Sequence, residues 1–246
     1  GRHVGSLRVA ADIVVMAAGS ISTPQLLLES GAAEGNPHIG KGLHLHPVVN
    51  SWGLLPVPAY GRGATQGHFV DEFSRDRVLL ESNPIIGGAF FQAFPVYGME
   101  AKELMSRANH MVSTGALLRD TSEGEVHAGL GGASRISYSV NEQDRKRTLI
   151  GLRKGSELWL EGAGAEMVAP HVYGGGMCRN MDQVMKALPD DLPAERIVAY
   201  SSHPQASCRI GRACGQDGKL LGAEGIYVMD ASALPSNVGR NPQISV

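Results

Sequence analysis

A short apolar run, followed directly by a glycine and a helix signal, constrains the fold of this chain more than any other feature. Residues Ile13–Ala18 read Ile-Val-Val-Met-Ala-Ala, which is typical of a strand covered on both faces. Gly19 follows, and a Leu-rich segment then continues to Ser30. Ser22 and Gln25 have the spacing of a capping box, so Ser22 is the predicted N-cap of a helix. A strand, a tight turn and a helix form an α/β unit, and such sheets usually bind ligands at the carboxyl ends of their strands.

The character of the sequence changes twice along the chain. Between residues 48 and 195, short β-prone stretches are separated by polar turns, as in an antiparallel sheet. Helices are expected there over about residues 98–109 and 142–161. The last part returns to α/β character at the apolar stretch Ile226–Met229. We therefore predict an α/β plus α+β fold, in which residues 1–47 and 196–246 form one domain and residues 48–195 are inserted between them.

Composition excludes several classes of protein. The 24 acidic residues nearly balance the 22 Lys and Arg residues, so nucleic acid is not an expected partner, because binding to phosphate backbones needs a basic surplus. Three cysteines cannot form a disulfide scaffold. Cys208 and Cys214 could form one bond, but two buried thiols are the better interpretation. The 32 glycines are nearly twice the usual share of about 7%, so tight turns and close backbone approaches are expected to be common.

Polar residues with catalytic potential occur near the end of the chain. His44 and His46 alternate as metal ligands would, but no third ligand stands at zinc spacing, so no metal site is expected. His203 precedes Pro204 in a run of small residues, and a neutral imidazole can accept a hydroxyl proton. On its own, such a histidine is more often structural than catalytic. Asn241 stands in an Asn-Pro step, which favours a turn that presents the amide side chain.

Motifs at both ends of the chain resemble those of the glucose–methanol–choline (GMC) family of flavin-dependent alcohol oxidoreductases. The motifs are residues 17–31, then 203–211, then 225–235, and finally Gly239 with Asn241-Pro242-Gln243. They occur in the family's order. Residues 36–47, 102–105 and 117–120 are similar to segments of the long-chain fatty alcohol oxidase branch.

The resemblance implies an FAD enzyme that oxidises the CH–OH group of an alcohol, most often a long aliphatic alcohol, to an aldehyde. The alcohol would deliver hydride to flavin N5 while His203 removes the hydroxyl proton and Asn241 holds the oxygen in line. Residues 1–47 and 196–246 would be parts of an incomplete FAD-binding, Rossmann-type domain, and residues 48–195 would form the substrate-binding domain. The residues expected near FAD are Ala18 and Gly19 at the adenosine half, Asp230 and Ala231 at the ribityl and pyrophosphate portion, and Pro242 and Gln243 at the isoalloxazine.

Two departures from the family pattern affect what this chain can do alone. The family's dinucleotide motif G-x-G-x-x-G is absent, and so is the helix that normally follows Asn-Pro-Gln. We therefore expect a missing N-terminal FAD-binding segment to be a partner of this chain, and we expect the chain alone to be inactive and to bind FAD weakly or not at all. A membrane anchor, if the protein has one, would lie in that segment, and the localisation stays open. A smaller departure is Ala206, where relatives often have Gly.

Two alternatives to long-chain alcohol oxidation stay open. The same flavin chemistry could serve a sterol, choline-like or aromatic alcohol. The chain could also be a non-catalytic fragment that keeps the fold and serves as a binding module. Phe90, Phe91, Phe94 and Trp159 in the middle region suit an apolar substrate, although aromatic residues most often pack in the core.

Overall fold

The computed structural model describes residues 5–32, 34–59, 66–83, 94, 96–129 and 132–242. Phe90, Phe91 and Gln243 lie outside the described residues. The strands are β1 (Val14–Met16), β2 (Lys41–Leu43), β3 (Val48–Leu54), β4 (Phe69–Val70), β5 (Val78–Asn83), β6 (Met111–Leu118), β7 (Gly124–Ala128), β8 (Ser134–Ser137), β9 (Met167–Pro170) and β10 (Ile226–Val228). The α-helices are α1 (Gly19–Ser30), α3 (Gly98–Ser106), α4 (Glu142–Glu157) and α5 (Met181–Ala187). Shorter turns are η1 (Glu72–Asp76), η2 (Ala108–His110), η5 (Ala194–Arg196), η6 (Ala231–Ala233) and the π-helical η4 (Leu158–Gly162).

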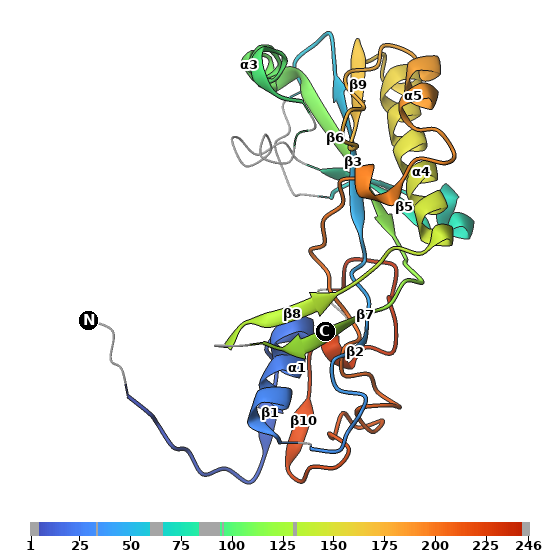
Figure 1. The fold of residues 1–246 in the computed structure, drawn as a ribbon. Helices are drawn as coiled ribbons and strands as arrows, with labels where there is room; N and C mark the ends of the chain where they lie inside the picture. The colour runs from blue at the N-terminus through green and yellow to red at the C-terminus, as the bar shows by residue number, and fades with distance from the viewer. Residues whose placement is uncertain are drawn as a thin grey trace.

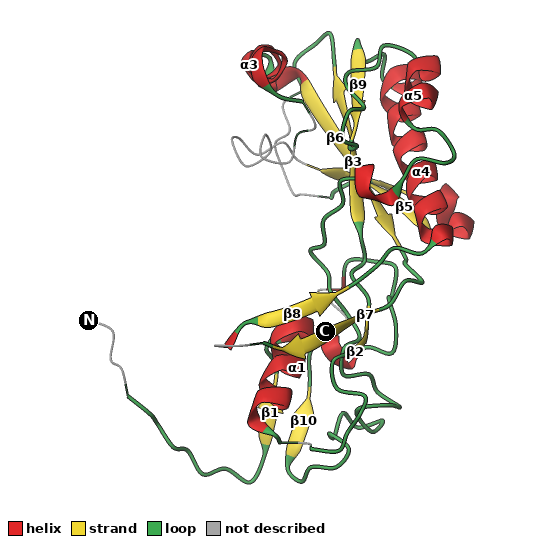
Figure 2. Cartoon of the chain, viewed as in Figure 1, coloured by secondary structure: helices red, strands yellow, loops and turns green. Residues whose placement is uncertain are grey.

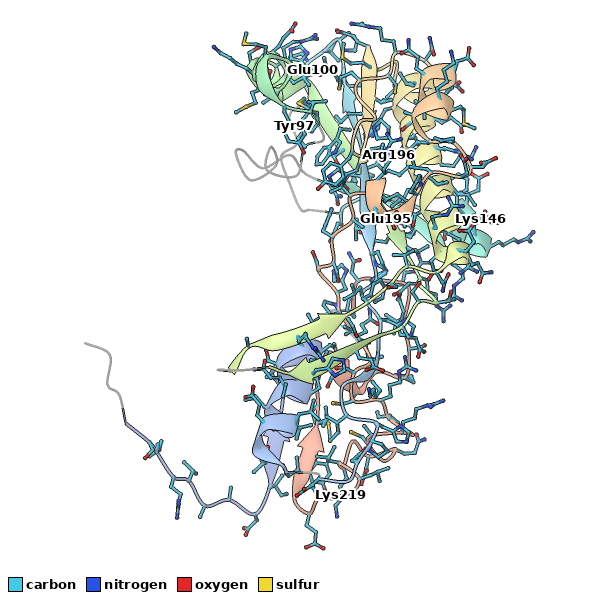
Figure 3. The ribbon with its side chains drawn as sticks, in the orientation of Figure 1. Tyr97, Glu100, Lys146, Glu195, Arg196 and Lys219 are labelled. Atoms are coloured by element: carbon cyan, nitrogen blue, oxygen red, sulfur yellow. The ribbon has the colours of Figure 1, made fainter. Side chains whose placement is uncertain are left out.

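The strands form three sheets in two parts of an elongated molecule (Figure 1). One part holds the parallel pair β1–β10 and the three-stranded sheet β2–β7–β8, and the other holds the five-stranded sheet in the order β4-β5-β6-β3-β9. The side chains of Tyr97 and Glu100 at α3 and of Lys219 near β10 mark opposite ends of the molecule (Figure 3). The predicted class, α/β plus an antiparallel α+β region, is confirmed.

The parallel pair differs from the prediction in its burial. β1 pairs with β10, Val14 opposite Ile226, as an α/β unit requires. Ile13, Val14 and Val15 are nevertheless 59%, 46% and 56% exposed, so the prediction of a strand covered on both faces is wrong for the described residues. Pairing with β10 covers an edge of β1 rather than its faces, and the apolar cluster around this strand pair includes Met16 but none of Ile13, Val14 and Val15.

Helix α1 begins earlier than the capping box predicted. It starts at Gly19, which has φ +86°, so Ser22 lies inside the helix and is not the N-cap. The N-cap Ala18 makes no side-chain capping bond. Instead the carboxylate of Asp230, 211 residues away, accepts the backbone N–H of Gly19 at 2.8 Å. A long-range acceptor therefore takes the place of a local cap.

The five-stranded sheet follows the prediction closely. The expected helix at 142–161 is α4 followed by the π-helical η4, and the helix expected at 98–109 is α3 followed by η2. The side chain of Asn141 caps α4 by accepting the N–H of Asp144 at 2.8 Å. α4 and α5 lie on one side of the sheet (Figure 2). Val78 and Leu80 of β5 pack there against Leu149 and Leu152 of α4 in the largest core cluster.

The hairpin β7–β8 joins the two parts of the molecule. It lies between residues 48 and 195, yet β7 pairs with β2 and packs against α1. Gly40 lies at the centre of this junction, because its N–H donates to Ser207 O at 2.7 Å and its carbonyl accepts the N–H of Val126 at 2.8 Å. The hairpin is thus associated with the α/β part rather than with the five-stranded sheet.

Two further sequence expectations concern cysteines and membrane spans. Cys178, Cys208 and Cys214 are free and buried, which confirms buried thiols over a Cys208–Cys214 bond. Among the residues that the structure describes, none of the helices is both long and apolar enough to cross a membrane.

Candidate functional site

The carboxyl ends of β1 and β10 are held together by Asp230. One carboxylate oxygen accepts the N–H of Gly19 at 2.8 Å and the hydroxyl of Thr23 at 2.5 Å. The other accepts the N–H and the hydroxyl of Ser232 at 2.8 and 2.5 Å. These four donors fill the acceptor positions of the carboxylate, so its role in this structure is to fix the turns after both strands.

The segment that carries His203 crosses the same strand ends. The Ser20 hydroxyl donates to Pro204 O at 2.8 Å, and the Ser207 hydroxyl donates to Ser20 O at 2.6 Å. The N–H of Ala206 donates to Ala231 O at 2.9 Å. Ala206 has φ +68°, a left-handed conformation that glycine adopts more easily than alanine.

A pocket of about 480 Å³ opens where these segments meet. Small side chains and backbone dominate its lining, which consists of Ala18, Gly19, Ser20, Ile21, Ser202, His203, Pro204, Ala231 and Pro242. A Cβ placed on Gly19 would meet no atom within 4 Å, so open space lies next to the backbone there. The structure thus gathers Ala18, Gly19, His203, Ala231 and Pro242, which the sequence singled out, around one pocket.

The imidazole of His203 lies at the edge of this pocket. Burial lowers the pKa of its imidazole below the usual value of 6.5. Its Nδ1 is buried and has no hydrogen-bond partner among the described residues. Nε2 is not among the buried atoms that lack a partner.

A second histidine supports His203 from the interior. The ring of His46 lies 5.3 Å from that of His203, centroid to centroid. Burial and the neighbouring His203 lower the pKa of His46 to about 4, against a smaller raising effect of Asp120. Two segments of the chain pair in antiparallel fashion next to these rings. His44 exchanges backbone hydrogen bonds with Gln205, and Val48 does so with Tyr200.

His44 and His46 do not converge on one point. Nδ1 of His44 lies 3.5 Å from Asp120, whereas His46 packs against His203. The described part of the chain contains no group of three or more His, Cys, Asp or Glu residues that could hold a metal ion. His44 and His46 therefore make two separate contacts, one with Asp120 and one with His203.

Asn241 lies on the other side of the junction, against the five-stranded sheet. Its Nδ2 donates to Gln66 Oε1 at 2.9 Å and to Glu81 Oε2 at 3.2 Å. Its Oδ1 is buried and has no partner among the described residues. No hydrogen bond joins Asn241 to His203 within the described ranges, although the next residue, Pro242, lines the His203 pocket.

The loop that carries Asn241 is anchored through Asn237. The side chain of Asn237 donates to Asp120 Oδ1 and to Leu118 O, and its oxygen accepts the N–H of Gly239 at 2.7 Å. Asp120 also accepts the Tyr138 hydroxyl at 2.7 Å. This buried carboxylate therefore connects the C-terminal loop to the domain junction.

Sequence reasoning missed the polar residues on the face of the five-stranded sheet that lies opposite α4. Glu81 is 6% exposed, and Asn50 accepts hydrogen bonds from Asn83 at 3.0 Å and from the Tyr200 hydroxyl at 3.2 Å. The available signal was Glu81, an acidic residue that directly follows the apolar run Val78-Leu79-Leu80. A charged side chain is rarely buried in a strand unless it has a partner or a role.

Comparison with known proteins identifies the family of this chain. Residues 120–246, just over half of the chain, match the C-terminal model of the family described as GMC oxidoreductase, and residues 1–48 match its N-terminal model. A long-chain-alcohol oxidase of Arabidopsis thaliana is 32% identical over 276 residues, which cover 100% of this chain and 36% of that protein. A GMC-type oxidoreductase of Mycobacterium tuberculosis is 33% identical over 248 residues, which cover 98% of this chain and 39% of that protein. The chain thus spans little more than a third of the length of these relatives.

Solved structures share the fold. The pyridoxine 4-oxidase from Mesorbium loti superposes with a TM-score of 0.61 at 19% identity, over 99% of this chain and 50% of that one. A formate oxidase gives a TM-score of 0.64 at 15% identity, over 96% of this chain and 52% of that one. These structures show the architecture, and the family models show the relationship. The chain belongs to the GMC oxidoreductase family.

Proposed function

We propose that the protein of which this chain forms part is an FAD-dependent oxidoreductase that oxidises the CH–OH group of an alcohol, with a long aliphatic alcohol as the favoured substrate. The observation that carries the proposal is His203, an imidazole that lines a pocket built by the turns after two parallel strands and whose pKa is lowered by burial. Similarity to long-chain-alcohol oxidases supports the substrate class.

The residues around the pocket fit a flavin. Backbone and small side chains line it at Ala18, Gly19 and Ala231, and backbone without side chains lets a nucleotide approach closely. Bound FAD would accept hydride from the alcohol carbon. Pro242 lies at the same pocket, while Gln243, which would offer a backbone N–H to the isoalloxazine, lies outside the described residues.

His203 and Asn241 would divide the work on the hydroxyl group. A neutral imidazole at Nε2 can take the hydroxyl proton, and the burial that lowers its pKa keeps it neutral at pH 7. The carboxamide of Asn241 would hold the oxygen in line, an orientation effect. Pro242, the neighbour of Asn241, lines the same pocket as His203, which would place both groups near one alcohol.

We propose domain boundaries near residues 47 and 196. The five-stranded sheet and its helices α4 and α5 lie between them. The β7–β8 hairpin would be the part of this middle segment that serves the FAD-binding domain, since it packs on α1.

Replacement of the proposed base tests the function. In the full-length protein, His203→Ala should lower the rate of anaerobic flavin reduction by 1-dodecanol by about 10²-fold or more, because the substitution removes the proposed proton acceptor from the pocket. The half-buried His127, which does not line the pocket, serves as the control when it is replaced by Ala and should leave the rate unchanged. An unchanged rate in His203→Ala would favour the non-catalytic alternative, and faster reduction by cholesterol or choline would move the substrate to those classes.

A further inference from the structure

Gln205 is a fully buried glutamine whose carboxamide binds main-chain groups at both ends. Nε2 donates to the carbonyl oxygen of His203 at 3.2 Å, and Oε1 accepts the N–H of Val238 at 3.0 Å. A carbonyl oxygen only accepts and a main-chain N–H only donates, so these two partners fix which way round the amide lies. Gln205 thereby joins two segments of the chain, because Val238 lies 33 residues further along the sequence.

The main chain of Gln205 is held independently of this side chain. Its N–H donates to His44 O at 2.8 Å, and its carbonyl accepts the N–H of His44 at 2.9 Å. The next residue, Ala206, donates its N–H to Ala231 O at 2.9 Å. The course of the segment that carries His203 is thus fixed by main-chain bonds, and a change of the Gln205 side chain should leave it intact.

The loop of residues 237–242 is anchored to two different parts of the molecule. The side chain of Asn237 donates to Leu118 O at 3.2 Å and to Asp120, both at the end of β6. The N–H of Val238 binds Gln205, and within the described residues this is the sole hydrogen bond between the loop and residues 200–211. Asn237 therefore links the loop to the five-stranded sheet, whereas Gln205 links it to the segment that carries His203.

The spacing of these two segments shapes the pocket. His203 lines the pocket from one segment, and Pro242 lines it from the other. Asn241 directly precedes Pro242, and its carboxamide is held by Glu81 and Gln66. A change in the spacing would therefore move the imidazole and the carboxamide relative to each other without altering either side chain.

We propose that Gln205 is a positioning residue that sets the spacing between His203 and the carboxamide of Asn241. This inference rests on the proposed function. Gln205 would touch neither the alcohol nor the flavin, since it is fully buried and both ends of its amide are occupied. It acts through the main chain of the two segments. The reaction needs both groups at one alcohol, and a small misplacement lowers the rate of an oriented reaction.

Replacement of the amide by an apolar side chain of similar length tests this role. In the full-length holoenzyme, Gln205→Met should lower the rate of anaerobic flavin reduction at saturating 1-dodecanol by roughly tenfold or more. The flavin content should stay that of the wild type, because the main-chain bonds of Gln205 remain.

Gln25→Met provides the matched control. Gln25 is also a buried glutamine with a long-range bond, because its Nε2 donates to Gly132 O at 2.7 Å. This bond holds neither the segment of His203 nor the loop of Asn241. The control should therefore keep the wild-type rate of flavin reduction.

Hydrogen exchange follows the link itself, independently of turnover. Loss of the acceptor in Gln205→Met should speed exchange of the Val238 amide, whereas Gln25→Met should leave it unchanged. Gln205→Asn keeps a carboxamide but is one methylene shorter, so it should lose its reach to Val238 and behave like Gln205→Met. This second variant keeps the buried site polar, so the test stands even if Gln205→Met does not fold.

A double-mutant cycle separates positioning from a general loss of structure. Gln205→Met added to Asn241→Ala should lower the rate by less than about threefold further, because the spacing matters only while the carboxamide is present. A full additional loss in the double variant would overturn the inference, and so would wild-type reduction rates or unchanged Val238 exchange in both Gln205 variants. If His203→Ala loses activity while the Gln205 variants keep it, this inference alone falls. If alcohols fail to reduce the wild-type flavin, the proposed function falls and this inference with it.

Discussion

The imidazole of His46 illustrates how a single residue shapes the site. It is fully buried with φ +50°, and neither ring nitrogen has a hydrogen-bond partner among the described residues. Its pKa of about 4 keeps it neutral beside His203 at pH 7. Two adjacent imidazoles cannot easily both be charged, so a neutral His46 leaves His203 free to receive the proton during turnover.

This burial predicts a loss of stability in acid. The pKa of His46 is lower in the folded state, about 4, than its ordinary value of 6.5, so the unfolded chain binds the proton more tightly. The contribution of His46 is therefore fully present above pH 6.5 and is lost as the pH falls toward 4, by roughly 3 kcal/mol in total. His46→Asn, which tolerates left-handed backbone and does not titrate, should flatten the dependence of unfolding free energy on pH between 7 and 5 in urea titrations.

The exposed His38 provides the comparison for this measurement. His38→Asn should leave the pH dependence of unfolding as it is in the wild type. Some slope should persist in His46→Asn, because burial lowers the pKa of His203 as well. A wild-type slope in His46→Asn would contradict the burial argument.

Among the elements, the junction at Gly40 controls how the hairpin reaches the site. Gly40 has φ +78°, and a Cβ there would overlap the carbonyl oxygen of Val126. Gly35 has φ +92°, but a Cβ there would meet nothing within 4 Å. The two glycines share a backbone conformation and differ in the space around them.

Alanine at these two positions separates backbone strain from overlap. Gly35→Ala should cost about 1 kcal/mol of stability, because alanine is strained in left-handed backbone. Gly40→Ala should cost a further ~1–3 kcal/mol, because β7 must move away from the new methyl group. Thermal unfolding of both variants measures the difference in their loss of stability. Equal losses would contradict the prediction, because they would show that β7 can move away from β2 without loss of stability.

Elements with local signals could be predicted from the sequence, whereas those set by distant contacts could not. The apolar period of α4 and the cap at Asn141 are local, and the helix was predicted within a few residues. The start of α1 was predicted at Ser22, but the helix begins at Gly19. The prediction failed because the acceptor for the Gly19 N–H is Asp230, 211 residues away in the sequence. His203 and Asn241 were recognisable by motif. The contacts of Glu81 and His46 could not be predicted in the same way, because their neighbours Asn241 and His203 come from distant parts of the sequence.

At the scale of the whole molecule, the exposed face of β1 is the main irregularity. Ile13, Val14 and Val15 expose apolar surface at the edge of a two-stranded parallel sheet, and parallel sheets are normally covered on both faces. The relatives have nearly three times the length of this chain. We propose that the remaining FAD-binding segment covers β1.

The 246-residue chain alone should therefore bind the hydrophobic dye ANS and carry little flavin. Fluorescence with ANS reports exposed apolar surface, and the visible flavin absorbance reports bound FAD. Val15→Thr, which keeps the β-branched shape but adds a hydroxyl, should reduce ANS fluorescence if β1 is the binding surface. A stoichiometric yellow protein from this chain alone would contradict the prediction.

The clamp between Asp230 and Gly19 also has a consequence for biosynthesis. The two residues are 211 positions apart, and the segment that carries His203 is held in place by Ser20 and Ala231, on either side of that separation. Contacts between such distant residues form slowly, because a long loop must close before they give any stability. During synthesis, the five-stranded sheet can fold before β10, the partner strand of β1, has been translated. The pocket around His203 should therefore form only after residues 203–242 have been translated, and a chain that stops before them should lack it.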